Sequence, residues 1–130
     1  MTIRNLQFMF KPASVALIGA SQRPGTVGSV VARNLFRAGF AGPVMPVNPH
    51  YQAIEGVLTY PDVASLPLVP ELAVIGTPPD TVPGIIGELG ARGTKAAIII
   101  TAGFAESGAS GRLLQQAVLD AAKPHLLRIV

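Results

Sequence analysis

Cysteine and tryptophan are both absent from this chain of 130 residues, and charged side chains are sparse at 13%. Without cysteine there is neither a disulfide nor a thiolate ligand for a metal, which is typical of a cytoplasmic protein. Ten Lys and Arg residues against seven Asp and Glu give a net charge of +3, and the basic residues are scattered. With two tyrosines and five phenylalanines, the chain lacks the basic stripe and stacking aromatics of a nucleic-acid-binding protein.

Long apolar segments are also missing. The longest one, at 96–105, is about half of a membrane span, and the first residues have no apolar core of a signal peptide. Nearly half of the residues are nevertheless hydrophobic, at 49%. A chain of this length and composition can build one core. We therefore expect a single domain over residues 1–130 that has no membrane partner.

Short continuous apolar runs alternate with amphipathic helical patterns along the chain. The runs are at 14–18, 44–47, 72–75 and 96–100, with a fifth from 126 to 130. Helical spacing appears over 27–38, 82–89 and 114–121. The predicted apolar faces are Val27, Val31, Leu35 and Ala38 in the first, Val82, Ile85, Ile86 and Leu89 in the second, and Leu114, Ala117, Val118 and Ala121 in the third. Strands without polar alternation are typical of a parallel sheet that is covered on both faces. The pattern predicts an α/β fold, a Rossmann-like, doubly wound and mainly parallel sheet within three α/β/α layers.

The stretch 50–71 interrupts this alternation, because it contains no helix of ordinary length. We interpret 57–60 as a short edge strand and 61–66 as at most one helical turn. The predicted strand order is 3-2-1-4-5-6, with 57–60 as strand 3 and 72–76 as strand 4. Strands 1 and 4 then flank the topological switch point, where ligands bind beyond the carboxyl ends of the strands.

The most informative feature is the loop that follows the first strand. Gly19 to Gly28 spans ten residues, whereas the dinucleotide motif Gly-x-Gly-x-x-Gly spans six. Its glycines let main-chain N–H groups approach a phosphate, and the next helix points its positive N-terminus at the same place. An NAD site also needs a carboxylate at the end of strand 2, but none occurs before Glu55. The loop therefore predicts a phosphate-bearing ligand, for which NAD is not the default choice.

Three more loops are expected on the same edge of the sheet: Asn48-Pro49-His50, Gly76-Thr77-Pro78-Pro79 and Thr101-Ala102-Gly103-Phe104. Taken alone, each loop consists of residues that are common in turns. Together, however, the loops predict a groove for an extended polyphosphate ligand. His50 is a further candidate for a contact at its rim.

Catalytic and metal-binding residues are not predicted. His50 and His125 are far apart and have no Cys or carboxylate at metal-ligand spacing. Ser21 lacks the Gly-x-Ser-x-Gly elbow of a nucleophile.

Four segments resemble the CoA-binding domain of NDP-forming (ADP-forming) acyl-CoA synthetases, such as acetate–CoA ligase, which are related to the succinyl-CoA synthetase α subunit. They are Ser-Val-Ala-Leu-Ile-Gly-Ala-Ser (14–21), Pro-Val-Asn-Pro (46–49), Glu-Leu-Ala-Val-Ile-Gly-Thr-Pro (71–78) and Ile-Thr-Ala-Gly-Phe-Ala-Glu (100–106). The resemblance covers the chain from about residue 6 to residue 130 and implies coenzyme A or acyl-CoA as the ligand. Together with the loop pattern at Gly28, it gives these cofactor-binding candidates: Gly19, Ala20, Ser21, Gln22, Arg23, Thr26, Gly28, Val47, Asn48, Pro49, Thr77, Pro78, Thr101, Ala102 and Gly103.

The resemblance further implies part of an acid–thiol ligase. Such an enzyme converts acid, CoA and nucleoside triphosphate into acyl-CoA, nucleoside diphosphate and phosphate, through a phosphohistidine in a later domain. Nucleotide and magnesium would bind in those other domains or in a partner subunit, so this chain alone is expected to bind without turnover. Because the family's last strand continues into a second domain, we expect a fragment of a longer chain, and homo-oligomers are compatible with the pattern.

One departure from the family concerns the residue after Asn-Pro, where many relatives carry lysine and this chain has His50 and Tyr51. Arg23 is the candidate substitute. Three alternatives stay open: a fused lysine acetyltransferase, a stand-alone CoA-binding regulatory protein, and an NAD(P)-binding oxidoreductase domain.

Overall fold

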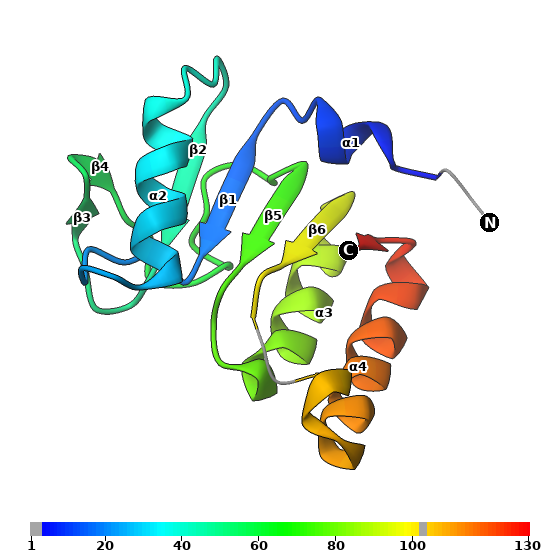
Figure 1. Cartoon of the computed structure of the whole chain (residues 1–130). Coiled ribbons are helices and arrows are strands. Elements are labelled where there is room, and N and C mark those ends of the chain that lie inside the picture. The colour runs from blue at the N-terminus through cyan, green and yellow to red at the C-terminus, as the bar shows by residue number, and fades with distance from the viewer. Residues whose placement is uncertain (1–3, 102–103) are drawn as a thin grey trace.

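The computed structural model describes residues 4–101 and 104–130. Strands and helices alternate through most of this part of the chain (Figure 1). The strands are β1 (Val15–Ile18), β2 (Val44–Val47), β3 (Ala53–Ile54), β4 (Val57–Leu58), β5 (Leu72–Ile75), β6 (Ala96–Ile99) and β7 (Arg128–Ile129). The helices are α1 (Gln7–Phe10), α2 (Val27–Arg37), α3 (Val82–Arg92) and α4 (Ala109–Ala122), with short 3₁₀ turns η1 (Pro79–Thr81), η2 (Ala105–Ser107) and η3 (Lys123–His125).

Five strands form one parallel sheet in the order β2-β1-β5-β6-β7. Val15 of β1 is in register with Val44 of β2 on one side and with Leu72 of β5 on the other. All four residues of β1 and of β5 are buried, as the continuous apolar runs predict. The predicted order is confirmed for these five strands, and the switch point lies between β1 and β5.

The interpretation of 57–60 as an edge strand of this sheet is wrong in detail. β4 pairs antiparallel with β3 in a separate two-stranded sheet, and Tyr60 alone reaches the main sheet, through a bridge to Val47. The physical reason is the turn between β3 and β4. Glu55 and Gly56 both have positive φ, at 52° and 77°, and this conformation folds a two-residue hairpin back on itself.

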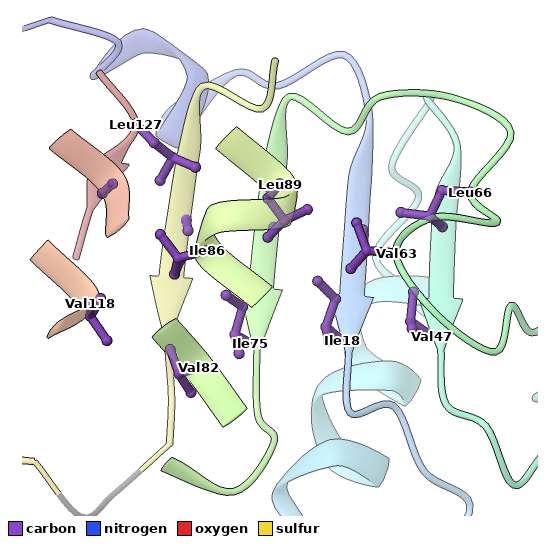
Figure 2. Close-up of a cluster of buried hydrophobic side chains, with 14 of the residues drawn as sticks. Ile18, Val47, Val63, Leu66, Ile75, Val82, Ile86, Leu89, Val118 and Leu127 are labelled. Atoms are coloured by element: carbon purple, nitrogen blue, oxygen red, sulfur yellow. The ribbon is translucent and has the colours of Figure 1, made fainter. Parts of the chain in front are cut away.

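Helices cover both faces of the sheet. Alternate strand residues contribute to two separate cores, with Ile18 and Ile75 in one and Leu17 and Val74 in the other. Figure 2 shows the first core, where Ile86 of α3 lies over β6 and Leu89 of α3 lies over β5. The second core includes Ala32 of α2. This arrangement confirms the three-layer α/β/α fold. Among the described residues, no helix has the length and apolar character needed to cross a membrane.

The apolar face predicted for α3 is confirmed, because Val82, Ile86 and Leu89 are all fully buried. The face predicted for α2 is wrong at both ends, since Val27 is 59% exposed, Ala38 is also exposed, and Gly28 is buried. A Cβ atom added at Gly28 would collide with the carbonyl oxygen of Gly19. The helix therefore turns its glycine, and not the preceding valine, toward β1.

Candidate functional site

A groove of about 430 Å³ lies at the carboxyl ends of β1, β2 and β5, next to the switch point. The loops after these strands contribute Gly19, Asn48 and Thr77 to its lining, and α3 contributes Ile85. This is the edge of the sheet at which the sequence places all four predicted loops. Its volume is within the range of small-molecule sites, which is roughly 300–1,000 Å³.

A second hollow, of about 560 Å³, adjoins the groove. It is lined by Ser21, Gln22 and Arg23 from the loop after β1, and by Asn48, His50 and Tyr51 from the loop after β2. Asn48 and His50 line both spaces. The groove and the hollow are therefore two parts of one rim on either side of the loop that follows β2.

The backbone segments that follow β1 and β5 approach each other closely at Gly19. Its φ is +96°, and an added Cβ would lie 2.9 Å from the carbonyl carbon and oxygen of Gly76. The N–H of Gly19 donates to Val47 at 3.0 Å, and the N–H of Gly76 donates to Ile18 at 2.8 Å. Only glycine meets both demands at this point. The ends of β1, β2 and β5 are thus joined through main-chain atoms, with no side chain of residue 19 in the groove.

Two hydroxyl groups fold the loop after β1 onto itself. The Ser21 hydroxyl accepts a hydrogen bond from the N–H of Arg23 at 2.9 Å and lies 3.5 Å from the Tyr51 hydroxyl. Thr26 donates to the carbonyl of Arg23 at 2.8 Å and caps α2 by accepting from the N–H of Ser29 at 3.2 Å. These bonds fix the backbone of the loop and leave the Arg23 side chain exposed beside the second hollow.

Asn48 connects the two loops at the rim. Its side-chain N–H donates to the carbonyl of Ala20 at 2.8 Å, and its side-chain oxygen accepts from the N–H of His50 at 2.8 Å. Ala20 itself is fully buried. The carboxamide therefore sets the position of the loop after β1 relative to the loop after β2.

Threonines hold the loop that follows β5. The Thr101 hydroxyl donates to the carbonyl of Thr77 at 2.7 Å, and the Thr81 hydroxyl donates to the carbonyl of Pro78 at 2.6 Å. The hydroxyl oxygens of Thr81 and Thr77 also lie within hydrogen-bond distance of each other, at 2.8 Å. Thr77, Pro78 and Thr81 line the groove, whereas Thr101 supports this loop from the segment that follows the neighbouring strand β6.

The structure brings most of the predicted cofactor-binding residues to this rim. Those in the groove are Gly19, Val47, Asn48, Pro49, Thr77 and Pro78, and those in the second hollow are Ser21, Gln22, Arg23 and again Asn48. Four others line neither space, and the structure gives each another role: Ala20 and Gly28 are packed inside, Thr26 caps α2, and Thr101 supports Thr77. Ala102 and Gly103 lie outside the described residues.

Sequence reasoning missed the opposite wall of the groove. Pro61, Asp62 and Val63 form part of it, and Ile85 and Glu88 of α3 form the rest. A signal existed for α3, because this helix follows the Thr77–Pro78 loop almost directly and must begin at the same edge. No motif marks 61–63, which belong to neither a helix nor a strand.

Charge is distributed unequally along the rim. Arg23 lines the second hollow, His50 lines both spaces, and the acidic residues Asp62 and Glu88 line only the groove. An anionic group is therefore favoured at the hollow and disfavoured at the wall. Within residues 4–101 and 104–130, no group of three or more His, Asp or Glu side chains could hold a metal ion.

Comparisons with known proteins agree with this geometry. A family model described as the CoA binding domain matches residues 13–130. Acetate–CoA ligase (ADP-forming) II of Archaeoglobus fulgidus is 38% identical over 128 residues, which are 98% of this chain and 19% of that protein. The α subunit of acetate–CoA ligase (ADP-forming) I of Pyrococcus furiosus is 35% identical over 130 residues, 97% of this chain and 28% of that subunit.

The same relationship appears among solved structures. The apo form of an acetyl-coenzyme A synthetase from Candidatus Korarchaeum cryptofilum superimposes with a TM-score of 0.89 at 37% identity, over 96% of this chain and 27% of that one. The chain thus spans about a fifth to just over a quarter of these relatives. The fold and the resemblance predicted from the sequence are confirmed.

Proposed function

The chain belongs to the CoA binding domain family, and we propose that it is the part of an NDP-forming acyl-CoA synthetase that holds coenzyme A. In the proposed reaction an acid, CoA and a nucleoside triphosphate give acyl-CoA, a nucleoside diphosphate and phosphate. The phosphoryl-transfer steps would take place in other domains or in a partner subunit, where nucleotide and magnesium would bind. The observation that carries the proposal is the groove at the switch point, which main-chain atoms line at Gly19 and Gly76.

The chemistry of the rim fits the two halves of CoA. Its phosphates suit the second hollow, where Arg23 and His50 supply donors and the backbone of residues 21–23 is fixed in place. The pantetheine arm is long, uncharged and carries amides. It suits the groove, where Ile18, Val63 and Ile85 offer apolar contacts and Asn48 and Thr77 offer polar ones.

The predicted residues divide into two roles under this proposal. Direct contacts come from those that line the rim: Gly19, Ser21, Gln22, Arg23, Val47, Asn48, Pro49, Thr77 and Pro78. Ala20, Thr26, Gly28 and Thr101 act indirectly, by holding these residues in place. Ala102 and Gly103 stay predicted contacts.

A dinucleotide is disfavoured by the position of the first carboxylate after β2. An NAD ribose needs an Asp or Glu at the end of that strand, where this chain has Asn48 and Pro49. Glu55 lies farther on, in the hairpin, with its carboxylate 4.0 Å from the guanidinium of Arg33 on α2. It is therefore engaged away from the rim.

Thermal unfolding with and without ligand tests the proposal. A ligand at about 100 times its dissociation constant adds about 2.7 kcal/mol to the free energy of unfolding. We expect CoA to raise the melting temperature and NAD⁺ to leave it unchanged. Stabilisation by NAD⁺ and not by CoA would contradict the proposed function. For the whole reaction, the assay is CoA-dependent formation of nucleoside diphosphate by this chain joined to the remaining domains.

A further inference from the structure

The segment 61–66 is neither a helix nor a strand, and its first three residues form a wall of the groove. Val63 and Leu66 are each only 3% exposed. Both belong to the same core as Ile18 and Val47, and Figure 2 shows them over β1 and β2. An irregular segment with a buried underside needs other groups to satisfy its main-chain carbonyls.

Arg92, the last residue of α3, supplies those groups. Its Nη1 donates to the carbonyl of Val63 at 2.6 Å, and its Nη2 donates to the carbonyl of Leu66 at 3.0 Å. The planar guanidinium can reach two acceptors at once, which an ammonium group cannot do in the same rigid way. The remaining bonds are short-range: Leu66 N–H to Val63, and Ser65 N–H to Asp62. Arg92 is thus a long-range anchor of the wall.

The same helix forms the adjoining part of the groove. Ile85 and Glu88 line it from α3, and Glu88 lies one helical turn before Arg92. Val63 lines the groove and also accepts a hydrogen bond from Arg92. The guanidinium therefore fixes the separation between the wall and α3, although Arg92 itself does not line the groove.

We propose that Arg92 is a positioning residue that holds segment 61–66 against α3 and thereby sets the affinity of the groove for CoA. This inference rests on the proposed function. Without the hydrogen bonds from Arg92, segment 61–66 becomes more flexible, and a bound ligand must then restrict its motion. The cost of ordering a loop on binding appears as weaker affinity.

The test compares Arg92→Met, Arg92→Lys and a matched control, Ser14→Ala. Methionine keeps an apolar side chain about as long as the arginine stem but has no hydrogen-bond donor. Lysine keeps the positive charge but lacks the planar guanidinium that donates to two carbonyls at once. The Ser14 hydroxyl accepts from the N–H of Glu71 at 3.1 Å and donates to Val69 at 3.4 Å. It thus fixes a later part of the same connection, at the opposite edge of the sheet. CoA affinity is measured by calorimetry well below the unfolding temperature, and hydrogen exchange is measured at the amides of residues 62–66.

We expect Arg92→Met to weaken CoA binding about tenfold, which is about 1.4 kcal/mol, and to speed exchange over residues 62–66. Arg92→Lys should recover part of both losses, and it replaces the methionine variant if the latter does not fold. Ser14→Ala should lower the melting temperature while leaving CoA affinity and this exchange unchanged. Unaltered affinity or unaltered exchange in the Arg92 variants would overturn the inference, as would an equal loss of affinity in Ser14→Ala. If the parent chain binds no CoA, the proposed function fails, and exchange alone decides whether Arg92 holds the wall.

Discussion

The side-chain amide of Asn48 donates a hydrogen bond of 2.8 Å to the main-chain carbonyl of Ala20. These residues come from the loops after β2 and β1, which form the two sides of the second hollow. Since the same side chain also accepts from the N–H of His50, one carboxamide fixes the relative position of both loops. The geometry of the phosphate end of the proposed CoA site therefore depends on a side chain that also lines it.

Replacement of Asn48 tests this dependence. Asn48→Ala removes both hydrogen bonds, and we expect it to lower the free energy of unfolding by about 1–2 kcal/mol and to weaken CoA binding. Asn48→Asp keeps the acceptor for His50 but loses the donor to Ala20 and adds negative charge beside the phosphates. It should therefore bind CoA more weakly than the alanine variant. Urea unfolding and calorimetry measure the two effects, and an aspartate variant that binds as well as the parent chain would contradict the assignment.

Gly19 and Gly25 form a matched pair for testing the close backbone approach. Both have positive φ, at 96° and 80°, so alanine at either position costs about 1–2 kcal/mol in backbone strain. At Gly25 nothing lies within 4 Å of an added Cβ, whereas at Gly19 the added atom meets the carbonyl of Gly76 at 2.9 Å. We expect Gly19→Ala to be clearly less stable than Gly25→Ala in urea unfolding. Equal stability of the two variants would show that this contact relaxes freely.

Arg23 is expected to act on the ligand and not on the fold. Its side chain is exposed at the second hollow, so Arg23→Gln should leave the melting temperature unchanged. CoA binding should weaken by about 1 kcal/mol, about fivefold, as is usual for an exposed charge contact, and the loss should shrink at high salt. Arg37→Gln, at the exposed end of α2, is the control and should bind CoA normally. The same loss in both variants would indicate a general charge effect and no specific contact.

Thr101 supports the groove through its hydrogen bond to Thr77. Thr101→Val keeps the shape and removes the donor, and we expect it to cost about 1 kcal/mol of stability and to weaken CoA binding slightly. Thr101→Ser keeps the hydroxyl and should restore the affinity. If valine and serine have the same affinity for CoA, the hydrogen bond has no part in shaping the site.

The parts of the site that the sequence predicts are those in which a local apolar pattern marks a strand and the ligand-binding residues follow that strand directly. A continuous apolar run that ends at Gly19 indicates a buried parallel strand followed by a ligand loop, and the structure has both. The same reasoning places Asn48 and Thr77 at one edge, because carboxyl ends of parallel strands share an edge. These inferences depend on the pattern of apolar residues over short segments, which can be read directly from the sequence.

Features that depend on distant contacts could not be found in this way. The rotation of α2 is set by the fit of Gly28 against Gly19, so the apolar pattern that includes Val27 is misleading. Segment 61–66 is irregular and is anchored by Arg92, which lies 29 residues beyond Val63 in the chain. No local pattern signals a wall that is held from so far away.

The most direct measurement is a crystal structure of this chain grown with saturating CoA. We predict the diphosphate against the main chain of residues 19–23 and beside Arg23, with the pantetheine arm in the groove between Ile18 and Ile85. An empty rim would contradict this assignment, as would CoA bound in a separate hollow, which is lined by Ile99, Gln115 and Val118.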